Sequence, residues 1–304
     1  MSAPRARPRT RPIGSGYTLA LGGGGGRGWA HIGVARALEE AGLRPGRIVG
    51  TSMGAIVGAG VAAGWSPDAM QRMARQTAVY RLVGRRARFA LFDPRPLLER
   101  LAEALGDPLI EELPTPLAVS AYDLVAGRPT AITSGRLVDA IERSMAVPFF
   151  FPPLCTSEEV WCDAGPWEAV PVSLARAWST EPVIGVWVDV PKPALLARRP
   201  VAALLRRAST RFGVGLGGDP LTARRYLALL AARWAEPVHE EAPDLLIRPR
   251  LGFVPAWDFT RVGPMVARGY RDARATLAQA GVSGGVTSAA ASMAEHEEEL
   301  IRAR

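Results

Sequence analysis

Short apolar runs alternate with stretches of helical periodicity along this chain, and the alternation predicts an α/β protein. A β-prone run at 17–21 leads into glycines, after which apolar residues recur at helical spacing from Trp29 until Gly42 supplies a stop. A second strand at 47–49 is followed by a helix of small residues at 55–63. Small side chains allow such a helix to pack closely against a sheet.

The remaining strands are predicted from short apolar runs, several of them apolar on both faces. They lie at 117–122, 130–133, 160–162, 183–190 and 245–247. Further helices are predicted from Ser66 and Pro67 to about residue 79, and over 96–105, 137–145 and 259–279. Continuous apolar strands that alternate with helices are typical of a mostly parallel central sheet covered by helices on both faces, which makes three layers.

Composition narrows the class of protein. The chain has 304 residues, of which 48% are hydrophobic and 22% charged, and this balance excludes a disordered or fibrous protein. No apolar run reaches the roughly 18 residues that span a bilayer. Two cysteines, Cys155 and Cys162, and three histidines disfavour both a disulfide framework and a multi-ligand zinc site. We therefore expect no metal site, and nothing in the sequence implies an organic cofactor.

The net charge of +8 is concentrated partly at the start of the chain, where four arginines alternate with other residues in a proline-rich segment. We interpret residues 1–14 as a disordered basic arm, 15–280 as one domain, and 281–304 as a flexible linker with a frayed acidic helix. The arm lacks the apolar core of a secretory signal. We expect a cytoplasmic protein that contacts, at most, the inner membrane surface, and no nucleic-acid partner; no oligomeric state is favoured.

A G-x-S-x-G motif follows the second predicted strand and precedes a helix. It consists of Gly50, Thr51, Ser52, Met53 and Gly54. This context predicts a nucleophile elbow, in which a sharp turn exposes the serine hydroxyl and close packing excludes side chains at the two glycines. The helix dipole would favour the negative charge that develops when Ser52 attacks a carbonyl carbon.

The glycine-rich segment after the first strand admits three interpretations. It comprises Gly23, Gly24, Gly25, Gly26, Arg27 and Gly28. A dinucleotide site would need an acidic residue at the end of the second strand, and a phosphate-binding P-loop would need Lys and then Ser or Thr after the last glycine; both are missing. The third interpretation, an oxyanion hole made of unobstructed backbone amides, fits the predicted nucleophile.

Two residues are candidates for the base that activates Ser52. Asp163 ends a predicted strand and is followed by small residues that leave its carboxylate open. His239 would complete a Ser-Asp-His order, although it lies in a polar segment typical of a solvated surface. His31, on the helix after the glycines, is interpreted as a packing residue, and His296 as a solvated residue of the acidic tail.

Taken together, the glycine segment at 23–28, the elbow at 50–54 and Asp163-Ala164-Gly165 closely resemble the bacterial patatin-like phospholipases. The resemblance covers roughly residues 16–280 and includes Ser144 to Pro153. It implies a serine acyl hydrolase that cleaves lipid acyl esters through a Ser-Asp dyad and an acyl-enzyme. Ser52 matches the nucleophile, Asp163 the proton acceptor, and the amides around Gly24, Gly25 and Gly26 the oxyanion hole.

One position departs from the family pattern. The family usually has glycine where this chain has Ala164, and the polar pair after Gly165 is replaced by Trp167 and Glu168. If that glycine normally has a positive φ, alanine would be strained by roughly 1 kcal/mol and the dyad misplaced. A catalytically weak lipid-binding or regulatory protein is therefore the alternative function.

Two segments are candidates for contact with lipid. Residues 201–234 alternate aliphatic residues with arginines, which predicts either a basic amphipathic lid or an ordinary helical layer. The three phenylalanines at 149–151 are expected either to line an acyl pocket or to lie in the core.

Overall fold

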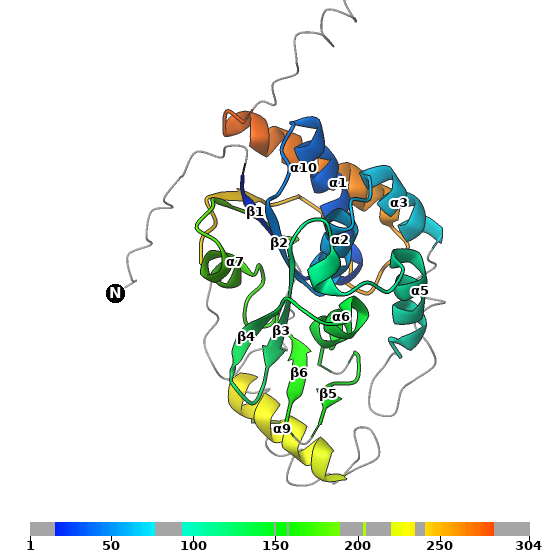
Figure 1. The fold of residues 1–304 in the computed structure, drawn as a ribbon, viewed down its shortest axis with the longest axis vertical. Coiled ribbons are helices and arrows are strands. Elements are labelled where there is room, and N and C mark those ends of the chain that lie inside the picture. The colour runs from blue at the N-terminus through cyan, green and yellow to red at the C-terminus, as the bar shows by residue number, and fades with distance from the viewer. Residues whose placement is uncertain are drawn as a thin grey trace, which may run out of the picture.

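A computed structural model describes residues 16–76, 93–148, 150–156, 158–188, 203–204, 220–234 and 241–282 of the chain. Eight strands form one mixed sheet that lies between helices (Figure 1). The predicted class, a mostly parallel sheet covered on both faces, is confirmed. The basic arm at 1–14, and all but the first two residues of the tail at 281–304, lie outside the described residues.

The sheet has a parallel half and an antiparallel half. Its strands are β1 (Thr18–Leu21), β2 (Arg47–Thr51), β3 (Leu117–Asp123), β4 (Arg128–Ile132), β5 (Leu154–Cys155), β6 (Val160–Asp163), β7 (Val183–Val186) and β8 (Leu245–Ile247). Strands β8, β7, β1, β2 and β3 pair in parallel. Strands β4 and β6 pair antiparallel with β3, and β5 pairs antiparallel with β6.

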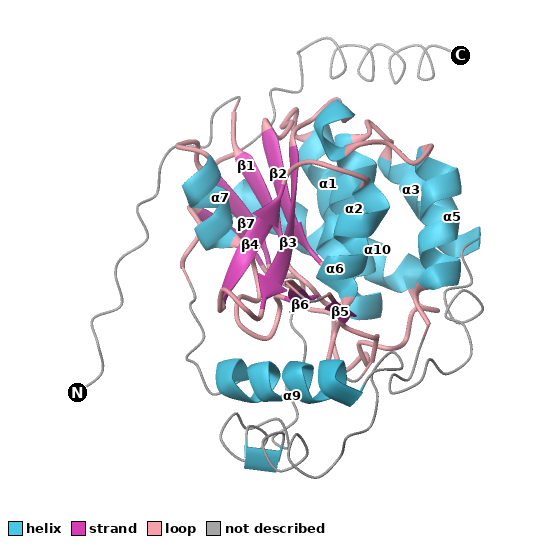
Figure 2. Cartoon of the chain, turned by 60° about the horizontal axis from the view of Figure 1, so that its bottom comes forward, coloured by secondary structure: helices cyan, strands magenta, loops and turns pink. Residues whose placement is uncertain are grey.

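The helices divide unequally between the two faces. They are α1 (Ala30–Glu40), α2 (Met53–Ala62), α3 (Pro67–Gln76), α5 (Arg95–Leu105), α6 (Leu137–Met145), α7 (Val172–Trp178), α9 (Pro220–Trp234) and α10 (Val262–Gln279), with the 3-10 turns η1 (Gly25–Trp29) and η2 (Ile110–Glu112). Figure 2 shows α7 on one face and α1, α2, α6 and α10 on the other, with α3 and α5 in the same layer. The helix α9 lies across the end of the sheet near β5 and β6, and it packs on residues of both strands.

Side chains point alternately to the two faces of the sheet, and their sizes explain why the helical layers on these faces are unequal. In β1, Leu19 and Leu21 belong to the large core under α1, α2 and α10, whereas Ala20 belongs to a smaller core under α7. Large side chains therefore face the thick helical layer, and small ones allow α7 to lie close to the sheet.

Two glycines bring α1 and α10 into direct backbone contact. A Cβ atom at Gly33 would lie 2.0 Å from the carbonyl oxygen of Val266, and one at Gly269 would lie 2.1 Å from that of Ala30. Any side chain at either position would force the two helices apart. Since α1 follows the glycine-rich segment directly, this crossing helps to position that segment.

Most predicted elements are observed within a few residues of their expected bounds. The helix α10 begins at Val262 rather than at residue 259 because the side chain of Asp258 accepts hydrogen bonds from the amide and hydroxyl groups of Thr260 and forms a turn there. The strand predicted at 183–190 ends at Val186. The two-residue strand β5 and the short helix α7 were not predicted.

The helix α9 tests part of the predicted basic amphipathic region at 201–234. Its residues Tyr226, Leu230 and Trp234 are buried in a cluster with Tyr122 and Trp167. The apolar face of α9 thus packs on the rest of the protein. For α9, this contact favours an ordinary helical layer over a basic amphipathic lid. Residues 201–202, 205–219 and 235–240 lie outside the described residues. No helix of the described chain is long and apolar enough to span a membrane.

Candidate active site

Ser52 occupies a strained turn between β2 and α2. Its φ of 55° and ψ of −121° are unusual for a residue with a side chain. A Cβ at Gly50 would lie 2.5 Å from the carbonyl oxygen of Gly54, and one at Gly54 would lie 2.3 Å from that of Leu21. Both glycines of the motif are therefore required by contacts with backbone atoms, as the predicted elbow demands.

Asp163 reaches Ser52 because two strands meet end to end on one edge of β3. In register, Thr51 of β2 lies opposite Ser120, and Asp163 of β6 lies opposite Ala121. Strand β4 occupies the other edge of β3 along the same residues, so β2 and β6 share one edge. They run in opposite directions, and their C-terminal ends face each other at neighbouring residues of β3.

The carboxyl group of Asp163 lies beside the Ser52 hydroxyl, which lowers the pKa of Asp163 as a hydrogen-bond donor. Its Oδ1 atom also accepts the amide of Gly165 at 2.6 Å. Asp163 is buried, and burial raises the pKa of its carboxyl group from 3.8 to about 6, an effect that both hydrogen bonds oppose. The structure thus places next to Ser52 a carboxylate that is more basic than an exposed aspartate.

Ala164 does not have the strain that its departure from the family pattern predicted. Among the described non-glycine residues, only Ser52 and Asp107 have a positive φ. Alanine is therefore accommodated after Asp163 without a left-handed conformation. The strain argument for a displaced Asp163 does not hold in this structure.

The other two departures have structural partners. The ring of Trp167 stacks on Tyr122 with centroids 3.9 Å apart, and its Nε1 donates to the carbonyl oxygen of Arg233 at 2.9 Å. Buried Glu168 accepts the amide of Ser173 in the first turn of α7 through Oε1 at 2.7 Å. Trp167 therefore attaches the segment after Asp163 to α9, and Glu168 attaches it to α7.

The glycine segment lies against the elbow. A Cβ at Gly23 would be 3.5 Å from the Cβ of Ser52, and one at Gly28 would be 2.2 Å from the side chain of Met53. The amide of Gly26 donates to the carbonyl oxygen of Ala256 at 2.7 Å, and that of Arg27 donates to the carbonyl oxygen of Gly24 at 3.2 Å. These two amides are therefore occupied in this structure.

The amides of Gly23, Gly24 and Gly25 have no acceptor among the described residues. The candidate oxyanion donors consequently lie one position earlier than Gly24 to Gly26, the set expected from the sequence. Gly24 and Gly25 also require the absence of a side chain, because a Cβ would lie 2.5 Å from Val188 and 2.1 Å from the carbonyl oxygen of Ala256, respectively.

Arg27 and His31 are buried next to the glycine segment, and both form hydrogen bonds with backbone carbonyl oxygens. Arg27 is buried, and its Nη1 donates to the carbonyl oxygens of Gly252 and Val254. His31 lies 2.8 Å from the carbonyl oxygen of Gly22 through Nε2, and burial lowers the pKa of its imidazole to about 4. A neutral His31 that donates to Gly22 is a packing residue, as expected. His239 and His296 lie outside the described residues.

Sequence reasoning missed Ser144 as a functional residue. Its buried hydroxyl accepts the backbone amide of Ser52 at 2.7 Å and donates to the carbonyl oxygen of Ser120 at 2.6 Å. Two residues later, the carbonyl oxygen of Ala146 accepts the amide of Asp163 at 3.1 Å. The end of α6 therefore holds the backbone of both residues. The sequence signals were a serine on the buried face of an amphipathic helix and its place at the start of the segment from Ser144 to Pro153 that resembles the family.

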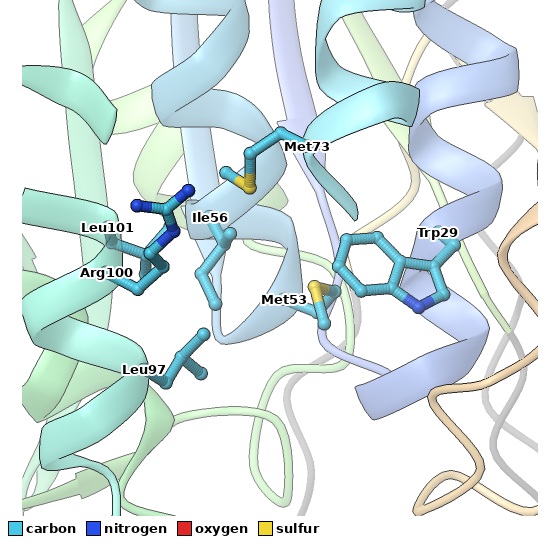
Figure 3. A pocket seen from close by; sticks show the side chains of 7 residues that line it. All are labelled: Trp29, Met53, Ile56, Met73, Leu97, Arg100 and Leu101. Carbon is cyan, nitrogen blue, oxygen red and sulfur yellow. The ribbon is translucent and has the colours of Figure 1, made fainter. Parts of the chain in front are cut away.

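An apolar crevice begins beside the elbow. Met53 and Ile56 of α2 face Leu97 and Leu101 of α5 across it, with Trp29 at one end (Figure 3). A second hollow continues along the same face of α2 past Val57 and Gly60. These positions follow helical spacing, so the two hollows lie along one face of α2. Of the phenylalanines that the sequence offered for this role, Phe150 and Phe151 do not line it, and Phe151 packs against the core. Phe149 is outside the described residues.

Comparison with known proteins identifies the family. The family model of the patatin-like phospholipases matches residues 19–176, a range that contains the glycine segment, the elbow and Asp163. The chain belongs to the patatin-like phospholipase family. Membership confirms the resemblance found in the sequence.

Several relatives share this patatin-like region. A segment of 180 residues is 34% identical to an uncharacterized NTE family protein of Mycobacterium tuberculosis, covering 57% of this chain and 46% of that protein. The human patatin-like phospholipase domain-containing protein 6 is 30% identical over 57% of this chain and 13% of its own length. Lysophospholipase nte1 of Aspergillus fumigatus is 31% identical over 51% of this chain and 11% of its own length. The matched region thus spans less than half of each relative.

A solved structure shares the fold. VipD from Legionella pneumophila superimposes with a TM-score of 0.54 over 89% of this chain and 67% of its own, at 14% sequence identity. Within the described residues, no group of three or more His, Cys, Asp or Glu side chains is arranged to hold a metal ion.

We expect Ser144→Ala to lower the reactivity of Ser52 by about tenfold, because the elbow amide would lose its acceptor and the strained turn would relax. The rate at which an organophosphonate labels Ser52 is measured over a range of reagent concentrations. This series gives the maximal labelling rate and the half-saturating concentration of the reagent separately. Only the maximal rate should fall. Thr18→Val removes another buried hydroxyl at the far end of β1 and should leave both values within twofold. Unchanged labelling in Ser144→Ala would contradict the role of Ser144.

Proposed function

We propose that this patatin-like protein is a lipid acyl hydrolase that works through a Ser52–Asp163 dyad and an acyl-enzyme. The observation that carries the proposal is the proximity of the Ser52 hydroxyl to the buried Asp163 carboxyl group, next to a row of glycine amides. The printed name of the Aspergillus relative, a lysophospholipase, supports a lipid ester as the substrate class.

The first half-reaction forms the acyl-enzyme. Ser52 Oγ attacks the ester carbonyl carbon while Asp163 takes the hydroxyl proton. The carbonyl oxygen becomes negative and is stabilised by the amides of Gly23, Gly24 and Gly25. The intermediate then breaks its bond to the alcohol, which leaves with the proton held by Asp163. The acyl group remains on Ser52.

The second half-reaction releases the fatty acid. Asp163 removes a proton from a water molecule, whose oxygen attacks the acyl carbon. The second intermediate breaks its bond to Ser52 Oγ, which recovers the proton from Asp163. Each group returns to its starting state, so the cycle needs no other reactant than water.

The apolar crevice between α2 and α5 is the proposed site for the acyl chain. It starts at Met53, the residue after the nucleophile, and is lined by aliphatic, thioether and indole side chains, with Arg100 at the side of α5 (Figure 3). An alkyl chain placed there removes apolar surface from water on both sides. The alternative of a catalytically weak lipid-binding protein depended on strain at Ala164, and no other observation favours it.

The dyad is tested with p-nitrophenyl butyrate, a soluble ester. We expect both Ser52→Ala and Asp163→Asn to lower kcat by at least a thousandfold, because each removes a group that bonds to the reacting atoms or holds their proton. Ser134→Ala, a surface substitution near the start of α6, serves as the control. Hydrolysis by Ser52→Ala at the wild-type rate would reject the proposal.

The pH dependence follows from the raised pKa of Asp163. Only the ionised carboxylate can accept the Ser52 proton, so kcat/KM should rise with pH and reach half its plateau near pH 6. Below that midpoint the rate should fall tenfold for each pH unit. The check is the initial rate with a soluble ester between pH 4 and pH 8, with unfolding monitored at each pH. A midpoint near pH 4 would show that burial does not set the basicity of Asp163.

Blocking the crevice should change the preference for chain length. In Ile56→Phe the added ring would fill the middle of the crevice, so kcat/KM for p-nitrophenyl octanoate relative to the butyrate should fall at least fivefold. Val61→Phe adds the same ring on α2 at a position that does not line the crevice, and its ratio should stay within twofold of wild type. Equal ratios in the two variants would remove the crevice as the acyl site.

A further inference from the structure

Residues 251–258, here called the aromatic turn, expose two large aromatic side chains. Phe253 is 90% exposed and Trp257 is 64% exposed. Their neighbours Leu251 and Val254 are buried. The chain therefore alternates here between anchored aliphatic residues and aromatic rings directed to solvent, an arrangement that folding alone does not favour.

Hydrogen bonds fix the position of Phe253. The amide of Val254 donates to the carbonyl oxygen of Gly252 at 3.1 Å, which makes Phe253 the apex of a tight turn. Nη1 of Arg27 donates to the carbonyl oxygens on both sides of it, at 2.9 Å to Gly252 and 3.0 Å to Val254. A buried arginine thus holds the backbone that carries the exposed ring, so little backbone conformational entropy remains to be lost when the ring is covered.

The aromatic turn borders the candidate active site. The carbonyl oxygen of Ala256 accepts the amide of Gly26 at 2.7 Å and lies where a side chain at Gly25 would be. The carbonyl oxygen of Phe259, next to the turn, accepts Nε1 of Trp29, which also lines the apolar crevice. Whatever covers the aromatic rings is consequently brought close to the glycine segment and to the start of the crevice.

The charge around the aromatic turn is positive. Six arginines and two aspartates occur between residues 248 and 274. The side chain of Arg250 is 86% exposed, that of Arg271 is 61% exposed and that of Arg261 is 59% exposed. Exposed aromatic rings flanked by arginines match an interface of apolar chains under acidic headgroups, because the rings enter the apolar boundary while the guanidinium groups remain at headgroup level.

We propose that the aromatic turn anchors this protein to an anionic lipid surface through Phe253 and Trp257, with Arg250 binding acidic headgroups. The inference rests on the proposed function for its choice of partner, since a lipid acyl hydrolase must meet its substrate at such a surface. The contact places the glycine segment and the crevice at the interface from which the acyl chain enters.

The test is the binding of the full chain to vesicles in a Ser52→Ala background, in which lipid is not consumed. Vesicles of phosphatidylcholine with phosphatidylglycerol are compared with phosphatidylcholine alone by co-sedimentation. We expect binding to the mixed vesicles, a loss of at least tenfold in affinity in Phe253→Ser/Trp257→Ser, and a loss of about threefold in Arg250→Gln that disappears at high salt.

Two control variants isolate the effect of position. Val125→Ser removes an apolar residue that is 43% exposed on the turn between β3 and β4, and Arg224→Gln removes an exposed arginine on α9. Both should bind within twofold of the parent. Thermal unfolding of every variant establishes that it is folded.

Each outcome decides the proposal. If the parent does not bind mixed vesicles, or if the double variant binds as well as the parent, the aromatic turn is not a lipid anchor. The result is independent of catalysis, because the parent already lacks Ser52. Absence of ester hydrolysis in the wild type would reject the proposed function but would leave the vesicle result to decide on the turn. Where both hold, the ratio of vesicle hydrolysis to soluble-ester hydrolysis should fall at least tenfold in Phe253→Ser/Trp257→Ser.

Discussion

The arrangement of the candidate site depends on one constraint, the end-to-end meeting of β2 and β6 on a single edge of β3. A purely parallel sheet would continue β2 alongside β3 or leave that edge open. Here the antiparallel strand β6 takes over the edge where β2 stops, so the two C-terminal ends face each other. This reversal brings Ser52 and Asp163 next to each other although they are distant in sequence. The antiparallel half of the sheet is therefore part of the site rather than an appendage to it.

The glycine segment and the elbow depend on each other sterically. A side chain at Gly54 would collide with the carbonyl oxygens of Leu21 and Gly22, and one at Gly28 would collide with Met53. A side chain at either glycine would therefore displace the other motif. Hydrogen bonds then hold the interlocked pair from outside, through Ser144 at the elbow and Arg27 at the glycine segment. Preorganisation of this kind lets amide dipoles act on a developing charge without first reorienting.

Much of this architecture could be predicted from the sequence, and the rest could not for identifiable reasons. Apolar runs locate the parallel strands, and the flanks of Ser52 identify the elbow, because both signals are local. The helix α7 is too short, and β5 has only two residues, for periodicity to reveal them. The roles of Ser144 and Gly26 depend on partners from distant segments, Ser120 and Ala256. The strain considered for Ala164 does not arise, because the condition for it, a positive φ at that residue, is not met.

The burial of Asp163 also sets how folding responds to acidity. A carboxyl group whose pKa is about 6 when folded and 3.8 when exposed binds its proton more tightly in the folded chain. Its contribution to the free energy of unfolding is therefore fully present below pH 3.8 and is lost as pH rises through 6, a difference of roughly 3 kcal/mol. The ionised form, which the proposed mechanism needs as the base, is thus the form that is least favourable to the stability of the fold.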